Sequence, residues 1–280
     1  MSLNPGLWRL CVGLLMCAVL APSMARAQDS YLVGVVPQFE ARRLHQIWQP
    51  ILEYLQRETG ASFRLIGAPT IPAFEKEFAR GNFDFAYMNP YHLIMANNAQ
   101  GYQPLVRDVG RQLYGVLVVS KHSGISRVQE LEGKAIAFPA PNALGASLMM
   151  RQELVDDFGL HFTPRYVKTH DSVYLNVLLS ETAAGGGVQK TLNQQKPQIR
   201  DNLTVIHETR KVAPHPLASH PRVSPAMAEK VVQAFLKLGQ SETGKSMLAP
   251  IPMQQPGRAQ FADYENLQAM GLDRFHVMDQ

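Results

Sequence analysis

The chain has 280 residues, a formal net charge of +4 and 18% charged residues, which is long enough for two lobes with separate cores. Its two cysteines, Cys11 and Cys17, both lie near the N-terminus, so the rest of the chain has no catalytic thiol, thiolate metal site or disulfide scaffold. Beyond the N-terminal segment no Lys/Arg cluster exceeds two or three residues, which argues against nucleic acid or a membrane surface as a partner.

The N-terminal segment has the features of a secretory signal peptide. Arg9 precedes an apolar run over 10–21, and Ala25-Arg26-Ala27 fits the cleavage pattern of small residues. A membrane anchor needs about 20 apolar residues, and Pro22 interrupts this run earlier. We therefore expect export and cleavage near Ala27, which lowers the formal charge from +4 to +2 by removing Arg9 and Arg26. A lipoprotein anchored at Cys17 is the alternative, but the bulky Met16 precedes that cysteine where a small residue is usual.

The first part of the exported chain predicts alternating strands and helices. Apolar residues at 31–37 are typical of a short buried strand, and Leu44, Trp48 and Leu55 then follow at helical spacing until Gly60. Further elements are expected as strands at 62–66 and 83–87 and a helix at 73–80. This alternation favours open, mostly parallel sheets covered by helices on both faces.

The second part of the chain repeats the pattern in a separate unit. A β-branched stretch at 113–120 is interpreted as a strand that crosses between lobes, and a second crossing is expected near 211–219. Between them we expect strands at 135–138, 165–168 and 203–207 and helices at 144–158, 173–180 and 188–195. Helices at 225–238, 242–248 and 263–270 then return to the first lobe. The predicted division is signal peptide 1–27, first lobe 28–117 plus 215–280, and second lobe 118–214.

One motif matches the phosphate-binding P-loop, but its context does not. Residues 239–246 read G-Q-S-E-T-G-K-S, a pattern that needs a strand before it and a long helix after it. Here a helical pattern precedes it and Pro250 follows closely. We interpret it as a junction between two helices.

Signatures of enzymes and metal sites are weak. The sequence has no G-x-S-x-G and no H-E-x-x-H. His215 and His220 are five residues apart, but two prolines in this stretch prevent a helical ligand face, and no third ligand is near. No catalytic residue, no metal and no cofactor are therefore predicted.

Polar or glycine-rich turns follow several predicted strands, at 37–40, 88–92, 139–143, 170–172 and 185–187. Ligands of open α/β sheets bind at the carboxyl ends of the strands, where such turns converge. The candidate ligand-binding residues are Phe39, Asn89, Tyr91, Asn142, Ala143, Leu144, His170, Asp171 and Gly186. For Asn142 and Asp171 the alternative role is a helix cap, and for the glycines a flexible turn. A helix starting near Leu144 would present free N–H groups to an anion.

The order of several short motifs resembles the phosphonate, phosphite and phosphate-binding family of periplasmic solute-binding proteins. The motifs are V-P-x-F-E at 36–40, G-N-F-D-F-A-Y-M-N-P-Y at 81–91, L-E-G-K at 131–134 and H-D-S-V-Y at 170–174. The resemblance covers essentially the whole exported chain. It implies an α/β fold of type II periplasmic binding proteins, with two lobes joined by two crossing strands and closing on ligand by a hinge motion.

The resemblance also implies site residues. Tyr91 and His170 match the family's aromatic and histidine donors to ligand oxygens, on opposite lobes. The family's hydroxyl-rich Ser/Thr turn is replaced here by Asn142-Ala143-Leu144, so two hydroxyl donors are missing and the identity of the ligand stays open.

The expected function is capture of a small oxyanion in the periplasm for an ABC permease, by a monomer that is not an enzyme. A sensor that signals its ligand to a membrane histidine kinase is the alternative, because both functions need the same cleft.

Overall fold

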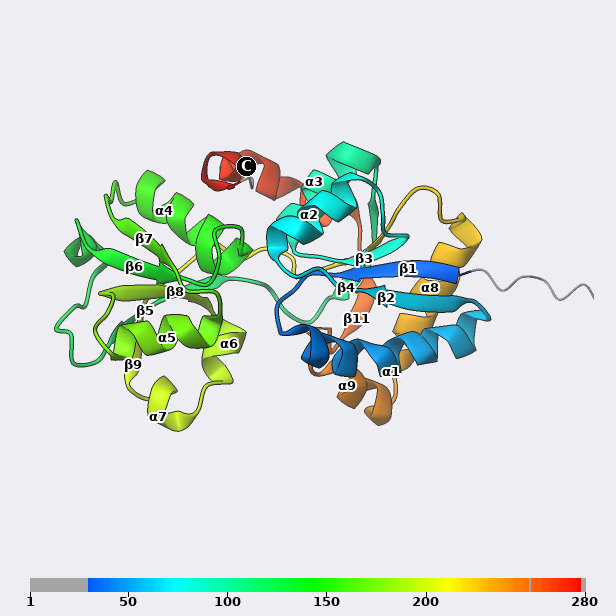
Figure 1. Cartoon of the computed structure of the whole chain (residues 1–280), viewed down its shortest axis with the longest axis horizontal. Helices are drawn as coiled ribbons and strands as arrows, with labels where there is room; N and C mark the ends of the chain where they lie inside the picture. The colour runs from blue at the N-terminus through cyan, green and yellow to red at the C-terminus, as the bar shows by residue number, and fades with distance from the viewer. Residues whose placement is uncertain (1–29, 252, 278–280) are drawn as a thin grey trace, which may run out of the picture.

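The computed structural model describes residues 30–251 and 253–277. Two sheets, each covered by helices, form two lobes side by side (Figure 1). The first-lobe sheet has the strand order β11-β4-β10-β3-β1-β2. Its strands are β1 (Ser30–Val35), β2 (Ser62–Ile66), β3 (Phe85–Tyr87), β4 (Gln103–Asp108), β10 (Leu217–Ser219) and β11 (Pro256–Arg258). β1, β2 and β3 pair in parallel, whereas β10 runs antiparallel to both β3 and β4.

Helices cover both faces of the first sheet, with α1, α8 and α9 on one side and α2 and α3 on the other (Figure 1). α1 begins without a side-chain cap and ends at Gly60, whose φ of +76° is the left-handed conformation that glycine favours at a helix end. Its buried stripe includes Leu44, Trp48 and Leu55, as the spacing predicted. The helices are α1 (Ala41–Thr59), α2 (Ile71–Ala79), α3 (Pro90–Gln100), α8 (Pro225–Leu238) and α9 (Glu242–Leu248).

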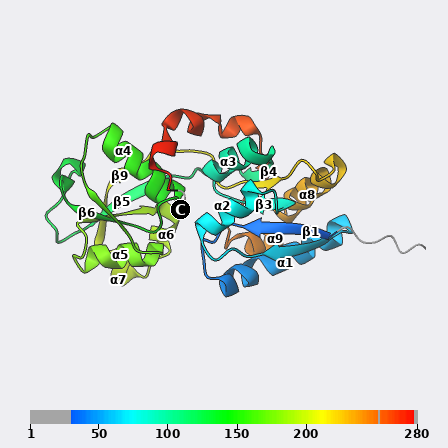
Figure 2. The same cartoon turned by 45° about the horizontal axis from the view of Figure 1, so that its top comes forward.

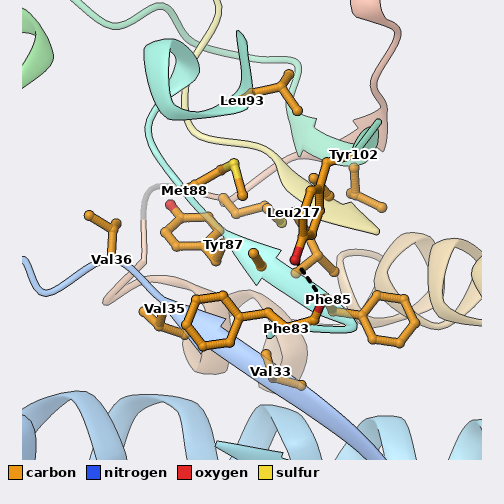
Figure 3. Close-up of a cluster of buried hydrophobic side chains, with 14 of the residues drawn as sticks. Val33, Val35, Val36, Phe83, Phe85, Tyr87, Met88, Leu93, Tyr102 and Leu217 are labelled. Carbon is orange, nitrogen blue, oxygen red and sulfur yellow. Dashed lines mark hydrogen bonds between the residues drawn. The ribbon is translucent and has the colours of Figure 1, made fainter. Parts of the chain in front are cut away.

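The core of the first lobe is built around β3. Figure 3 shows Phe83, Phe85 and Tyr87 among aliphatic side chains of β1 and β10. The buried Tyr102 hydroxyl donates to the Phe83 carbonyl at 2.6 Å, which satisfies a polar group that would otherwise be costly inside this core. Trp48 of α1 packs on Tyr87 with ring centroids 5.0 Å apart.

The second-lobe sheet has the order β7-β6-β8-β5-β9, with β5 antiparallel to its neighbours β8 and β9. Its elements are β5 (Gly115–Ser120), β6 (Ala135–Phe138), β7 (Thr163–Tyr166), β8 (Ala184–Val188), β9 (Leu203–Glu208), α4 (Met150–Asp156), α5 (His170–Leu178), α6 (Gln189–Asn193), α7 (Pro197–Arg200) and the short turns η1 (Val128–Leu131) and η2 (Leu144–Met149). Successive residues of β5 bury opposite faces: Leu117 and Val119 pack with α4, and Val116 and Val118 with α5. Both faces are covered, so the strand is apolar throughout.

Two segments connect the lobes. Residues 109–114 lead out of the first lobe and 209–216 lead back, and the two are joined by reciprocal backbone hydrogen bonds of 2.8 and 2.9 Å between Leu113 and Val212. The whole of β5 belongs to the second sheet, so the expected boundary between residues 117 and 118 falls inside a strand. Likewise β10 lies in the first sheet and is not a crossing segment.

The glycine triplet is a strand, whereas the sequence predicted a turn. Gly185, Gly186 and Gly187 lie in β8, the central strand of the second sheet, and are buried. Sheet hydrogen bonds and close packing of η2 and α5 on either side override the low strand propensity of glycine.

The C-terminal strap, residues 261–277, passes from the first lobe to the second (Figure 2). Its helical turns are η3 (Phe261–Asp263), η4 (Glu265–Met270) and η5 (Leu272–Phe275), where the sequence predicted one helix confined to the first lobe. Asp263 holds the Arg107 guanidinium at 2.9 and 3.0 Å on the first lobe. At the other end Arg151 of α4 donates to the Phe275 carbonyl at 2.6 Å.

The predicted signal peptide lies outside the described residues. Among the residues that are described, no helix is long and apolar enough to span a membrane.

Candidate functional site

A cavity of about 430 Å³ lies between the lobes. The first lobe contributes the turn after β1, the start of α2, Asn89 and the segment around His215, and the second lobe contributes the starts of η2, α5 and α6. The connecting residues 111–114 form its back. The carboxyl ends of strands from both sheets therefore meet at this cavity, as expected for a ligand site in open α/β sheets.

Five of the nine candidate residues line the cavity: Phe39, Asn89, Ala143, Leu144 and His170. Phe39 stacks under the Arg43 guanidinium, which lies 4.0 Å from the ring centroid. Asn89 caps α3, and its side-chain oxygen accepts from the His92 amide at 2.8 Å. Asn89 therefore both caps α3 and lines the cavity.

Tyr91 does not line the cavity. It is 9% exposed, belongs to the core of the first lobe and lies 6.0 Å from the His276 ring of the strap. Burial raises the pKa of its hydroxyl. The helical turn after Pro90 directs this side chain toward the strap, so the donor role that the resemblance implied for Tyr91 has no geometric support.

Asn142 is buried in a polar contact between the lobes instead of facing a ligand. Its Nδ2 lies 3.1 Å from both carboxylate oxygens of Glu75 on α2 and donates to the Val277 carbonyl at 2.9 Å. Burial would raise the pKa of Glu75, but hydrogen bonds from His276 and His92 outweigh burial and hold this pKa at about 2. Glu75 is therefore ionised at neutral pH, and Asn142 links it to the strap.

Asp171 and Gly186 also lie away from the cavity lining. Asp171 is exposed in the first turn of α5 and accepts from Gln195 Nε2 at 2.7 Å. Gly186 is enclosed by the Ala146 carbonyl and the Phe138 ring. Asp171 is thus an acidic residue in the first turn of α5, and Gly186 is a buried residue of β8.

His170 opens α5 at the cavity, behind the Thr169 cap, whose hydroxyl accepts from the Ser172 amide at 3.1 Å. Burial lowers the pKa of His170 to about 4, so the ring is neutral at pH 7. Its Nδ1 is buried and has no hydrogen-bond partner among the residues that the structure describes.

His215 is a second neutral histidine at the cavity. From the sequence it was discussed only as a possible metal ligand. Its Nε2 lies 2.9 Å from Gln38 Nε2 and its ring stacks on Tyr87 at 5.6 Å. Burial lowers its pKa to about 3, so Nε2 accepts from the Gln38 amide and the ring proton is on Nδ1. Within the ranges the structure describes, no three His, Cys, Asp or Glu side chains are arranged to hold a metal.

The start of η2 presents backbone donors to the cavity. The amides of Ser147 and Leu148 both donate to the Ala143 carbonyl, at 2.8 and 3.1 Å, the second bond being a π-helical one. The N–H groups of Leu144, Gly145 and Ala146 lie in the first turn, where no carbonyl of the same helix can accept from them, and they are therefore free for a ligand. Gly145 also allows close packing, because a Cβ there would lie 3.1 Å from the Gly115 amide.

The cavity is cationic, which sequence reasoning missed. Arg111, Lys168 and Lys190 line it, and no Asp or Glu does so among the described residues. Burial, with the positive charges of Arg111 and Arg43, lowers the pKa of Lys190 to about 8. These cations are isolated in the sequence, and only the fold brings them together.

A second cavity, of about 460 Å³, lies on the second lobe beside Phe275. Its wall is mostly apolar, and its arginine, Arg151, already donates to Ser147 Oγ and to the carbonyls of Pro141 and Phe275. The interlobe cavity is therefore the better candidate, because Arg111 makes no such contact with a described residue and Lys190 makes only one, with the Pro250 carbonyl at 3.3 Å.

Comparison with known proteins gives a consistent result. Residues 33–264 match the family described as the periplasmic substrate-binding protein of the phosphonate ABC transporter. The phosphate-import protein PhnD of Mycolicibacterium smegmatis is 21% identical over 229 residues, covering 74% of this chain and 71% of that protein.

Two solved structures share the fold. PhnD1 from Prochlorococcus marinus in complex with methylphosphonate has a TM-score of 0.78 and 15% identity, over 89% of this chain and 99% of that chain. A Xanthomonas citri protein bound to ATP has a TM-score of 0.74 and 15% identity, over 89% of this chain and 98% of that one.

Proposed function

Because the chain belongs to the family of periplasmic substrate-binding proteins of phosphonate ABC transporters, we propose that its interlobe cavity captures a phosphorus oxyanion and releases it unchanged to a permease. Members of this family are solute-binding proteins and not enzymes. The single observation that supports an anion is the composition of the cavity wall, which has three cations and, among its described residues, no carboxylate.

The anion is held by charge and by neutral donors together. The free amides at the start of η2 and of α5 point the positive ends of two helical turns at the same space. His170 and Gln38 add uncharged side-chain donors, whereas the amide nitrogen of Asn89 already contacts His92 Nε2 and the Asn142 carbonyl. Phe39, Ala143 and Leu144 complete the wall. Tyr91, Asn142, Asp171 and Gly186, which the sequence also suggested, do not line the cavity.

The known ligands of related folds support this ligand class. The structural neighbours were solved with methylphosphonate and with ATP, and the M. smegmatis relative is a phosphate-import protein. All three molecules are phosphorus oxyanions.

Export, partner and assembly follow as parts of the same proposal. A protein of this family works in the periplasm, which agrees with the signal peptide that the sequence predicts before Gln28. We expect a monomer that docks on an ABC permease. The comparisons give no support to the alternative partner, a membrane histidine kinase.

A thermal-shift panel on the mature protein tests the function. At 100 times its dissociation constant, a true ligand stabilises the native state by about 2.7 kcal/mol, which corresponds to a melting shift of several degrees. Phosphate, phosphite and a series of phosphonates are expected to include such a ligand, whereas glucose and spermidine serve as neutral and cationic controls. A panel in which only the controls raise the melting temperature would contradict the proposal.

A further inference from the structure

We propose that Arg111 and Lys190 select the charge of the ligand, and that the apolar part of the cavity holds an organic substituent. The preferred ligand class is then a phosphonate or phosphate ester with a bulky apolar group, in preference to inorganic phosphate. This inference rests on the proposed function and specifies the ligand of the same site.

The turn that precedes η2 supplies no side-chain donor to a headgroup. Asn142 is engaged by Glu75 and Val277, and Ser147, fully buried in η2, does not line the cavity. Ala143, Leu144 and Ala146 have no polar side-chain atoms. Besides the backbone amides of η2, recognition of negative charge must therefore come from other residues of the cavity wall.

Arg111 and Lys190 are the cations available for that task. Arg111 is partly buried and its side chain makes no hydrogen bond or ion pair with any described residue. The Lys190 ammonium has one partner, the Pro250 carbonyl at 3.3 Å. The two are close enough that Arg111 helps to lower the pKa of Lys190, and both charges lower the pKa of His215.

The carboxylate that acts on Lys190, that of Asp108, does not neutralise this pair. Asp108 is buried, and its oxygens accept from the backbone amides of Gly110 at 2.8 Å and of Gln254 at 2.7 Å. It favours the charged form of Lys190 but is outweighed there by burial and by the two arginines. An anionic ligand would supply the missing counter-charge. Lys168 also lines the cavity but is exposed, so solvent screens its contribution.

The size and wall of the cavity indicate the rest of the ligand. About 430 Å³ lies within the range of sites for drug-sized molecules, whereas inorganic phosphate has only five non-hydrogen atoms. Apolar side chains line it from both lobes and the connection: Val36, Phe39, Ile71, Leu113, Leu144 and Val188. A small oxyanion would leave these surfaces in contact with water, and an aryl or branched alkyl group would cover them.

Calorimetric titration with matched probes tests the inference. Phenylphosphonate and phenyl phosphate are expected to bind at least tenfold more tightly than methylphosphonate or inorganic phosphate. Arg111→Gln and Lys190→Gln are each expected to weaken phenylphosphonate binding at least tenfold. Lys245→Gln is the control, because Lys245 is on the surface and pairs with Glu242 at 2.7 Å.

The melting temperature of the ligand-free variants separates recognition from folding. Removing one of two like charges that lack a counter-ion should leave the melting temperature unchanged or raise it, whereas loss of a structural contact would lower it. Equal affinity for methylphosphonate and phenylphosphonate, or wild-type affinity in both cation variants, would overturn the inference while the proposed function stands. Binding of none of the four probes would instead refute the proposed function.

Discussion

Gly186→Ala tests the placement of the glycine triplet inside the second lobe. A Cβ at this position would fall well inside van der Waals contact of the Ala146 carbonyl oxygen and 2.7 Å from a ring carbon of Phe138. Neither neighbour moves freely, because the Ala146 carbonyl belongs to the backbone of η2 and the Phe138 side chain is fully buried in β6. Such overpacking costs about 1–3 kcal/mol.

That cost corresponds to a fall in melting temperature of about 2–12 °C, since 1 kcal/mol shifts a protein of this size by roughly 2–4 °C. Differential scanning calorimetry measures the fall. Gly67→Ala is a matched control, because a Cβ on the exposed Gly67 meets nothing within 4 Å. A Gly186→Ala protein with wild-type melting temperature and abolished ligand binding would refute this placement and restore the direct ligand contact that the sequence suggested.

Three further predictions concern charge and the lobe contact. Lys190 loses its proton near pH 8 in the free protein, so affinity for a fully ionised phosphonate should fall from pH 8 to pH 9.5, and Lys190→Gln should remove this dependence in calorimetry. The pKa values of His170 and His215 lie at about 4 and about 3 in the folded protein, below the usual 6.5, so the unfolded chain binds more protons in this interval. Stability should therefore decrease as pH falls from 6.5 to 4, and a flat melting temperature over that interval would contradict the assignment. Asn142→Ala removes a donor from the buried Glu75 carboxylate, a loss of about 1–3 kcal/mol, and it removes the partner of the Val277 carbonyl and amide, so hydrogen exchange at the end of the strap should accelerate. Unchanged protection would show that Asn142 does not hold the strap.

Local chemistry was enough to predict many elements from the sequence. The α8 helix runs from Pro225 to Leu238, as expected, because Ser224 caps it and an apolar stripe continues to its end. The interval 242–248 is also a helix, so the P-loop match lies at a helix junction, where Ser241 caps α9 and accepts from the Gly244 amide at 3.0 Å. Such signals reside within a few neighbouring residues and need no tertiary information.

The site was only partly predictable, for physical reasons. Asn142 has the side chain of a helix cap or a ligand donor, and nothing nearby in the sequence reveals that Glu75, 67 residues earlier, is its partner. The β8 glycines resemble a turn because their role depends on how closely η2 and α5 pack against the sheet. Arg111 and Lys190 stand 79 positions apart and become a charge pair only because β5 and β8 pair in the second sheet, with Gly115 opposite Val188.

The strap gives the two lobes a third tie besides the segments 109–114 and 209–216. Rotation about those two connections must displace the contacts that residues 274–277 make with α4 and Asn142. A receptor whose competent arrangement is populated one-tenth of the time binds about tenfold more weakly than its intrinsic affinity allows. We therefore expect the strength of the strap contacts to change the apparent affinity through the population of that arrangement, independently of every side chain that touches the ligand.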